Sequence, residues 1–329
     1  MSADADAAVD AVGEAQDGGP GPVVVGIDGV EESRAALTWA ATEAARRGTW
    51  LHVVHAAPQP VYGDVWTGGY APLVLEELEA VARRTVEAAA EVARQTSPVR
   101  VRTHVSHESP RKALLTAAAG AQLVVTGARR RGRGHSGLLG GFVLGSTSLF
   151  IASRTPCPAV VVREEPAAGA RGVVVGWDGS AQAEAALRWA ADRATATDGD
   201  LLVLTVWRAP ADRATGFDPG AFEDARRAAG EDVDRRVQDV LDRLRREHPG
   251  LRVQGRGVED TDPGDVLLAA AEDAELLVVG ARGHGAFVSA LLGSTSHDVL
   301  HRATCPVVVV PDAGRAAEHR GGDRSGARA

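Results

Sequence analysis

Residues 23–29 read VVVGIDG, and residues 173–179 read VVVGWDG, so one strand-and-turn pattern occurs twice in the chain. The segments that follow also match, because AALTWAA at 35–41 corresponds to AALRWAA at 185–191. A repeat of this length is a duplicated domain, since each unit is large enough to bury a core of its own. A site found in one copy is therefore to be sought in the other.

The length of 329 residues accommodates two such domains, and a hydrophobic content of 44% is ample for two cores. The sequence predicts repeat 1 over residues 20–163 and repeat 2 over 171–311, joined by a linker over 164–170. The polar ends, 1–19 and 312–329, lack periodicity, and we expect them to be disordered.

Charge and apolar runs exclude several classes of function. The formal net charge of -8 argues against a nucleic-acid-binding surface, which normally requires a basic face. No apolar run approaches the roughly 20 residues that span a bilayer, and the N-terminal residues do not resemble a signal peptide. Cys157 and Cys305, the two cysteines, occupy equivalent repeat positions that indicate packing in a reducing compartment. We therefore expect a cytoplasmic protein without a membrane segment.

Within each repeat, short valine-rich runs alternate with alanine-rich helical stretches. In repeat 1 the pattern predicts five strands, at residues 23–27, 51–56, 99–105, 123–126 and 159–162. The helices expected between them cover residues 32–47, 73–94, 111–119 and 146–153. Continuous apolar strands separated by helices indicate a parallel sheet covered on both faces. The predicted fold class is α/β, with two tandem five-stranded, doubly wound domains that bind ligands beyond the carboxyl ends of the strands.

The loop after the fourth strand carries the chemistry. In repeat 2, Gly280-Ala281-Arg282-Gly283 is followed by nine residues and then by Gly293-Ser294-Thr295-Ser296, which opens a helix. Glycines let backbone amides approach a ligand, and a helix N-terminus favours an anion. Hydroxyls and the Arg282 guanidinium add donors, and Asp178 ends the first strand of the repeat. Together these groups suit a polyphosphate, with Asp178 near a ribose or a metal.

The arrangement resembles the universal stress protein family in its tandem two-domain form. The resemblance rests on Gly-x-Asp-Gly-Ser at 176–180, on Gly-x-x-Gly-x9-Gly-Ser at 280–294, and on the Cys-Pro-Val-Val-Val strand that ends repeat 2. It implies an adenine-nucleotide α-hydrolase-like fold and ATP, with or without Mg²⁺, as the ligand. The implied ATP-binding residues of repeat 2 are Gly176, Asp178, Gly280, Arg282, Gly283, Gly285, Gly293, Ser294 and Thr295.

Repeat 1 departs from this pattern. Arg130 stands where the second loop glycine belongs, and fourteen residues instead of nine separate it from Gly145. Val30 replaces the serine equivalent to Ser180, so the following helix loses the side chain expected to cap it. We therefore expect a weaker site here, or only a solvated variant of the loop. Its candidate residues are Gly26, Asp28, Gly127, Arg129, Gly145, Ser146 and Thr147.

Two classes of function fit these residues. The first is an ATP-binding regulatory protein of the stress response, in which bound nucleotide stabilises a conformation that an unidentified protein partner recognises. The second is a weak ATPase, which is disfavoured because phosphoryl transfer needs more than the one acidic residue evident at the site. An interaction scaffold with vestigial nucleotide sites remains a third possibility for repeat 1. No catalytic or metal-ligating residues are assigned.

The last strands of the two repeats, at 159–162 and 307–310, are wholly apolar. As free sheet edges they would invite aggregation. We therefore predict that they pair with each other in an intrachain pseudo-dimer, on which a homodimer could be built.

Overall fold

The computed structural model describes residues 20–57, 71–130, 142–167, 169–209, 219–283 and 292–312. Repeat 1 contains seven strands: β1 (Val23–Ile27), β2 (Leu51–Ala56), β3 (Val101–Ser106), β4 (Leu123–Gly127), β5 (Arg129–Arg130), β6 (Phe142–Val143) and β7 (Ala159–Val162). Four helices lie between them: α1 (Arg34–Arg46), α2 (Ala71–Thr96), α3 (Pro110–Ala118) and α4 (Ser146–Arg154). Apart from β5 and β6, these elements agree with the sequence-based expectation, and their ends shift by a few residues.

Repeat 2 follows the same order. Its strands are β8 (Val173–Gly176), β9 (Asp200–Trp207), β10 (Arg252–Glu259), β11 (Leu276–Gly280) and β12 (Val307–Val310). Its helices are α5 (Ala181–Ala196), α6 (Pro219–Glu247), α7 (Pro263–Ala270) and α8 (Ser294–Arg302). Only the small antiparallel pair β5–β6, in the altered loop of repeat 1, was not expected from the sequence.

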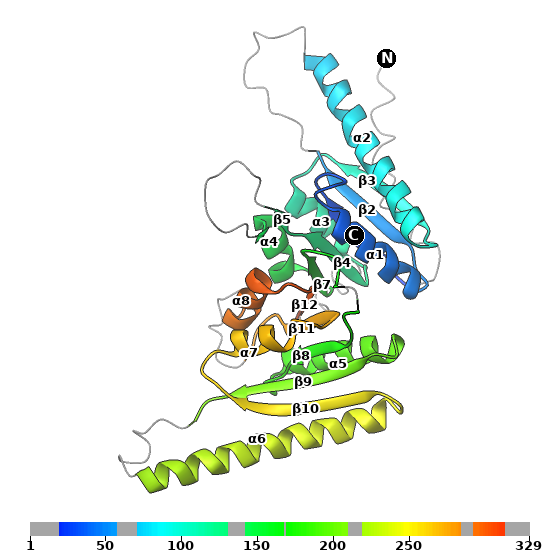
Figure 1. Cartoon of the computed structure of the whole chain (residues 1–329). Coiled ribbons are helices and arrows are strands. Elements are labelled where there is room, and N and C mark those ends of the chain that lie inside the picture. Colours follow the sequence, from blue (N-terminus) through cyan, green and yellow to red (C-terminus); the bar gives the residue numbers. More distant parts are fainter. Residues whose placement is uncertain are drawn as a thin grey trace, which may run out of the picture.

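Ten strands form one continuous sheet, in the order β10-β9-β8-β11-β12-β7-β4-β1-β2-β3 (Figure 1). Neighbouring strands are parallel within each repeat. The repeats meet where β12 pairs with β7 in antiparallel orientation, with Val308 opposite Val160. The two last strands therefore pair as expected, and neither is left as an apolar edge.

Alternating valines explain why both faces of the sheet are covered. Val23 and Val25 point into a core shared with α1, α2, α5 and α6, whereas Val24 points into a second core on the opposite face. All three valines are fully buried. Each such side chain contributes about 1.5–3 kcal/mol of burial free energy. Both cores run through both repeats, so the junction is packed like the interior of one domain.

The winding of each repeat reverses beside its first strand. In repeat 1, β2 lies on one side of β1 and β4 on the other, and in repeat 2 the strands β9 and β11 flank β8 in the same way. Helices leaving neighbouring strands therefore cover opposite faces, which opens a crevice at the carboxyl ends of the strands. Among the residues that the structure describes, no helix is long and apolar enough to cross a membrane.

Candidate functional site

A cavity of about 350 Å³ lies at the carboxyl ends of β8 and β11 in repeat 2. One side is apolar, with Leu204, Val206 and Pro263, and the other is formed by the glycine loop and the start of α8. Of the residues predicted for this site, those that line the cavity are Gly176, Asp178, Gly280, Arg282, Gly283, Gly293, Ser294 and Thr295. Gly285 lies outside the described residues.

The start of α8 is fixed to the end of β11 by two hydrogen bonds. The Ser296 hydroxyl donates to the Gly280 carbonyl at 2.6 Å, and the Gly293 amide donates to the Ala281 carbonyl at 2.8 Å. The first amides of a helix have no acceptor within it, and they point along its axis. The helix therefore presents N–H donors and the positive end of its dipole to the cavity, which suits an anion.

The loop glycines allow close approach of backbone segments. A Cβ atom on Gly283 would lie 2.5 Å from Oδ2 of Asp178, and one on Gly280 would lie 3.0 Å from the backbone of Gln182. Any side chain at Gly283 would therefore displace the Asp178 carboxylate. Gly176 also has a packing role, because its Cβ would lie 3.1 Å from a methyl group of Leu267 on α7.

Arg282 is the cation of this cavity. Its side chain is 22% exposed, and Nη2 donates to Oδ2 of Asp312 at 3.1 Å. The buried Nε has no hydrogen-bond partner within the described part of the chain. The guanidinium group thus places a positive charge at the wall of the cavity.

Asp312 is a residue that the sequence-based reading placed in the C-terminal tail. It lies two residues after the end of β12, accepts from Arg282, and also accepts from Nε2 of Gln182 at 3.1 Å. These two hydrogen bonds therefore hold Asp312 at the rim of the cavity. Its position two residues beyond a core strand is the only signal that could have indicated the contact.

Asp178 lies in a tight turn between β8 and α5. Its Oδ1 accepts from the Ser180 amide at 2.9 Å, and Gly179 adopts a positive φ of 82° that favours glycine. The Ser180 hydroxyl in turn accepts from the Ala183 amide and caps α5, as predicted. The carboxylate is thereby held at the same end of the sheet as the start of α8.

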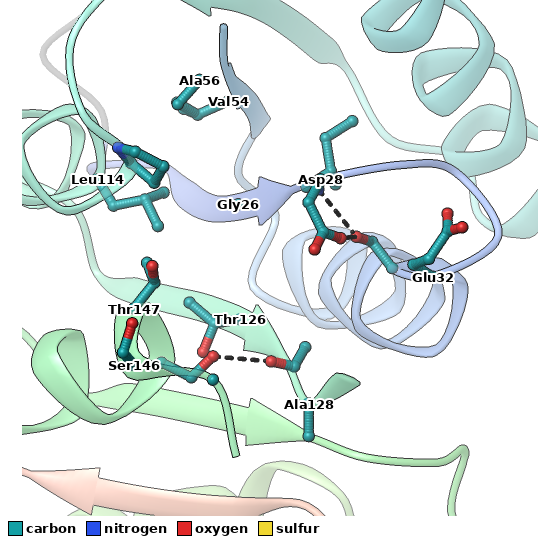
Figure 2. A pocket seen from close by; sticks show the side chains of 16 residues that line it. Gly26, Asp28, Glu32, Val54, Ala56, Leu114, Thr126, Ala128, Ser146 and Thr147 are labelled. Carbon is teal, nitrogen blue, oxygen red and sulfur yellow. Dashed lines mark hydrogen bonds between the residues drawn. The ribbon is translucent and has the colours of Figure 1, made fainter. Parts of the chain in front are cut away.

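Repeat 1 has a corresponding cavity of about 180 Å³, shown in Figure 2. Its lining includes every candidate residue of this repeat except Arg129: Gly26, Asp28, Gly127, Gly145, Ser146 and Thr147. The Ser148 hydroxyl donates to the Gly127 carbonyl at 2.8 Å, which repeats the bond between α8 and β11. Arg129 belongs to β5, and its side chain, like residues 131–141, lies outside the description.

The rim of the first cavity differs in two ways. At the start of α1 no side chain caps the helix, and the Ser33 hydroxyl instead donates to Oδ1 of Asp28 at 3.0 Å. Glu32 lines the cavity at the position that Gln182 occupies in repeat 2. Asp28 and Glu32 make the described lining negative, whereas Asp178 and Arg282 balance each other in repeat 2.

Neither cysteine takes part in these cavities. Cys157 and Cys305 are buried and not disulfide-bonded. Burial raises the pKa of each thiol to about 11, which holds it protonated and unreactive. Both thiols belong to the core cluster beneath α3, α4, α7 and α8, so their equivalent positions reflect packing, as the sequence predicts.

Fold and cavities together define a tandem, doubly wound α/β protein with one crevice in each repeat. The sequence model of the universal stress protein family matches residues 21–163 and 170–311. The chain belongs to the universal stress protein family, in its tandem two-domain form.

Relatives over nearly the whole length agree with this assignment. A universal stress protein of Mycolicibacterium smegmatis is 34% identical over 298 residues, covering 88% of this chain and 96% of that protein. One from Mycobacterium tuberculosis is 30% identical over 302 residues, covering 87% and 96%. The crystal structure of a universal stress protein from Archaeoglobus fulgidus matches with a TM-score of 0.59 at 20% identity, covering 88% and 96%, and so supports the fold.

Proposed function

We propose that this chain is an ATP-binding regulatory protein of the stress response, with its stronger nucleotide site in repeat 2. One observation carries the assignment: the N-terminus of α8, the glycine loop and the side chain of Arg282 border the same cavity. Few ligands other than a polyphosphate would use all three groups. Membership of the universal stress protein family supports the stress-response role.

The lining suggests how ATP would be oriented. Leu204, Val206 and Pro263 offer the apolar surface that an adenine ring requires. The amides of α8, with Arg282 and the hydroxyls of Ser294 and Thr295, would receive the phosphates. The Asp178 carboxylate would accept hydrogen bonds from a ribose or help to hold Mg²⁺.

Binding is favoured over catalysis by the acidic residues of the site. Asp178 is the only carboxylate among the described residues that line the second cavity. Phosphoryl transfer requires a positioned nucleophile, charge neutralisation and, in most enzymes, a base. Hydrolysis would therefore be slow, and the ligand would act by stabilising one conformation for a protein partner. A vestigial site within an interaction scaffold is the alternative for repeat 1, which the carboxylates Asp28 and Glu32 favour.

The same proposal places the protein in the cytoplasm. Two buried cysteines that form no disulfide suit a reducing compartment.

Calorimetric titration of the full-length protein with ATP tests the site directly. Gly283→Val places a branched side chain against Asp178 and the phosphates, and we expect the affinity to fall more than tenfold, by about 1.4 kcal/mol or more. Gly145→Ala in repeat 1 is the matched control, because its Cβ would meet only Ser148, at an ordinary 3.8 Å. Unchanged ATP affinity in a folded Gly283→Val protein would refute the assignment.

A further inference from the structure

The antiparallel junction between the repeats is formed by strands of nearly identical sequence. β7 reads AVVV and β12 reads VVVV. In the observed register Val161 faces Val307, Val160 faces Val308, and Ala159 faces Val309. Two copies of β7, or two copies of β12, could form the same apolar ladder. The strands therefore hold the repeats together without selecting which repeat pairs with which.

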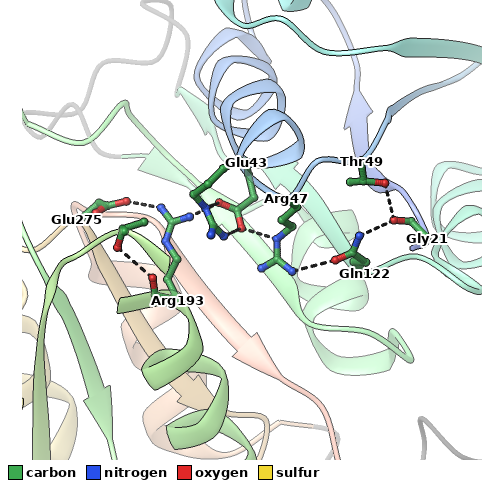
Figure 3. A network of polar contacts seen from close by, with 9 residues as sticks. Gly21, Glu43, Arg47, Thr49, Gln122, Arg193 and Glu275 are labelled. Atoms are coloured by element: carbon green, nitrogen blue, oxygen red, sulfur yellow. Dashed lines mark hydrogen bonds and ion pairs between the residues drawn. The ribbon is translucent and has the colours of Figure 1, made fainter. Parts of the chain in front are cut away.

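Two buried charges lie above this junction. Glu43 on α1 and Arg193 on α5 are 2% and 7% exposed, and no other charged side chain in the described part of the chain is buried to this degree. Nη1 of Arg193 donates to Oε2 of Glu43 across the junction, and Nη2 donates to Glu275 of its own repeat (Figure 3). A buried ion pair is costly to form, which makes its presence at this position informative.

The two partners occupy the same position in the repeat. The 35–41 and 185–191 segments align with an offset of 150 residues, and Glu43 and Arg193 differ by the same number. Pairing of repeat 1 with a second repeat 1 would bring two Glu43 carboxylates together, and pairing of repeat 2 with itself would bring two Arg193 guanidinium groups together. Like charges at such a buried junction repel, and each would lose the opposite charge that the other repeat now supplies. Glu43 would keep only Arg46 and Arg47, and Arg193 only Glu275.

The residues around the pair are also specific to one repeat. At the end of α1, Arg46 and the C-cap residue Arg47 both bond to Glu43, and the equivalent positions at the end of α5 are Ala196 and Thr197. The Arg47 guanidinium also lies 5.8 Å from the ring centre of Trp189 in the other repeat. Burial raises the pKa of Glu43, but the hydrogen bond from Arg46 and the charges of Arg193 and Arg47 outweigh it, so this pKa lies below its usual value.

We infer that the Glu43–Arg193 pair selects the partner at the junction, so that the surface formed by α1 and β7 accepts only a repeat of the second type. The strands supply affinity, and the ion pair supplies discrimination against like-with-like pairing. In the native chain the accepted partner is the chain's own repeat 2. The selected partner does not depend on whether either cavity binds ATP.

A double-mutant cycle in the full-length protein tests the interaction. Urea unfolding is measured for Glu43→Gln, Arg193→Gln and the double variant. We expect each single variant to unfold at a lower urea concentration, because it removes the buried ionic contact that crosses the junction, and the double variant to lose less than the sum of the two. The exposed pair Arg226–Glu259 is the control, for which the corresponding cycle should be additive or nearly so. Additive losses at Glu43 and Arg193 would overturn the inference.

A mixing experiment tests selection itself. Two differently tagged full-length chains, one with Glu43→Arg and one with Arg193→Glu, are unfolded together and refolded. Each variant alone opposes like charges at its own junction, whereas in the mixture each substituted residue can face an opposite charge in the other chain. We expect a mixed two-chain complex, or recovery of folded protein, that neither variant alone nor a mixture of unsubstituted chains gives. No gain from mixing would show that the pair does not select the partner, even if the cycle is non-additive.

Discussion

The two cavities of this chain are built on the same backbone frame but present different charges. In both, a serine at the third position of the last helix bonds to the glycine that ends the fourth strand, Ser148 to Gly127 and Ser296 to Gly280. The backbone arrangement that would hold an anion is therefore present in both repeats. The two cavities differ in the side chains around their rims.

Three differences favour an anion in repeat 2. The cavity there is larger, about 350 Å³ against about 180 Å³. Arg282 lines it, whereas no cationic side chain lines the first cavity within the described part of the chain. Gln182 replaces the carboxylate that Glu32 contributes to the first cavity. We propose that, after duplication, these few residues altered the ligand preference of the cavities while the fold stayed the same.

Of the changes considered, removal of the Arg282 side chain is expected to alter the ATP affinity of repeat 2 the most. Arg282→Ala loses a charge-assisted hydrogen bond worth about 1.5–3 kcal/mol, so ATP affinity in calorimetry should fall about 10- to 100-fold. Arg302→Ala is the control, because it removes an equal charge from the far end of α8, where Arg302 pairs with Asp298 and Asp265. Equal losses in both variants would mean that general charge, and not the site, governs affinity.

Exchange of the residue at position 32 with its equivalent at position 182 should reduce the difference in ATP affinity between the two cavities. Gln182→Glu places a carboxylate beside Asp312, which accepts from Arg282, and should weaken ATP binding about three- to tenfold, since a unit charge at 4 Å in water contributes about 1 kcal/mol. Glu32→Gln, measured in the Gly283→Val background so that only repeat 1 reports, should strengthen binding to a similar extent. If neither exchange alters affinity, rim charge does not explain the inequality.

The N-terminal caps of α1 and α5 differ in sequence, and we expect them to differ in what they contribute to the free energy of unfolding. Ser180→Ala removes the acceptor for the Ala183 amide and should lower the free energy of unfolding by about 1 kcal/mol. Repeat 1 has Val30 at this position and no side-chain cap on α1. Urea unfolding followed by far-ultraviolet circular dichroism measures the change, and an unaltered midpoint would show that α5 does not depend on the cap.

A smaller, pH-dependent difference concerns the second strands, where His52 of repeat 1 corresponds to Leu202 of repeat 2. Burial, with the charges of His104 and Arg102, lowers the pKa of His52 to about 4. The neutral ring is therefore favoured by folding, and its contribution is complete above about pH 6.5 and is lost as pH falls from there toward 4. His52→Leu should flatten the acid side of a stability profile and leave stability at pH 7 little changed. A profile identical to that of the unsubstituted protein would contradict this.

Most of the fold could be predicted because its signals are local. Valine runs such as 23–27 and helical stretches such as 34–46 follow from periodicity, and the apolar sequences of β7 and β12 indicated that these strands would pair. Because the chain contains the unit twice, each pattern in one repeat could be checked against the same pattern in the other. The candidate residues of the two cavities could be proposed from glycine spacing and position at strand ends.

Contacts between distant segments could not be predicted in this way. The pairing of Asp312 with Arg282 joins residues 30 apart through a fold that sequence spacing does not reveal. The bond between Glu43 and Arg193 joins positions 150 apart, and on helical periodicity alone both read as ordinary surface charges. The exchange of Glu32 for Gln182 was visible in the alignment of the repeats, but only the structure shows that Glu32 lines the first cavity and that Gln182 donates to Asp312.

Native mass spectrometry of the gently purified full-length protein tests the unequal-site account most directly, because it counts bound nucleotides per chain. With ATP added stepwise, we predict that one nucleotide binds well before any second, and that Gly283→Val removes this first binding event while Gly145→Ala keeps it. Two nucleotides binding with equal affinity, or a first nucleotide that survives Gly283→Val, would contradict the assignment of the stronger site to repeat 2.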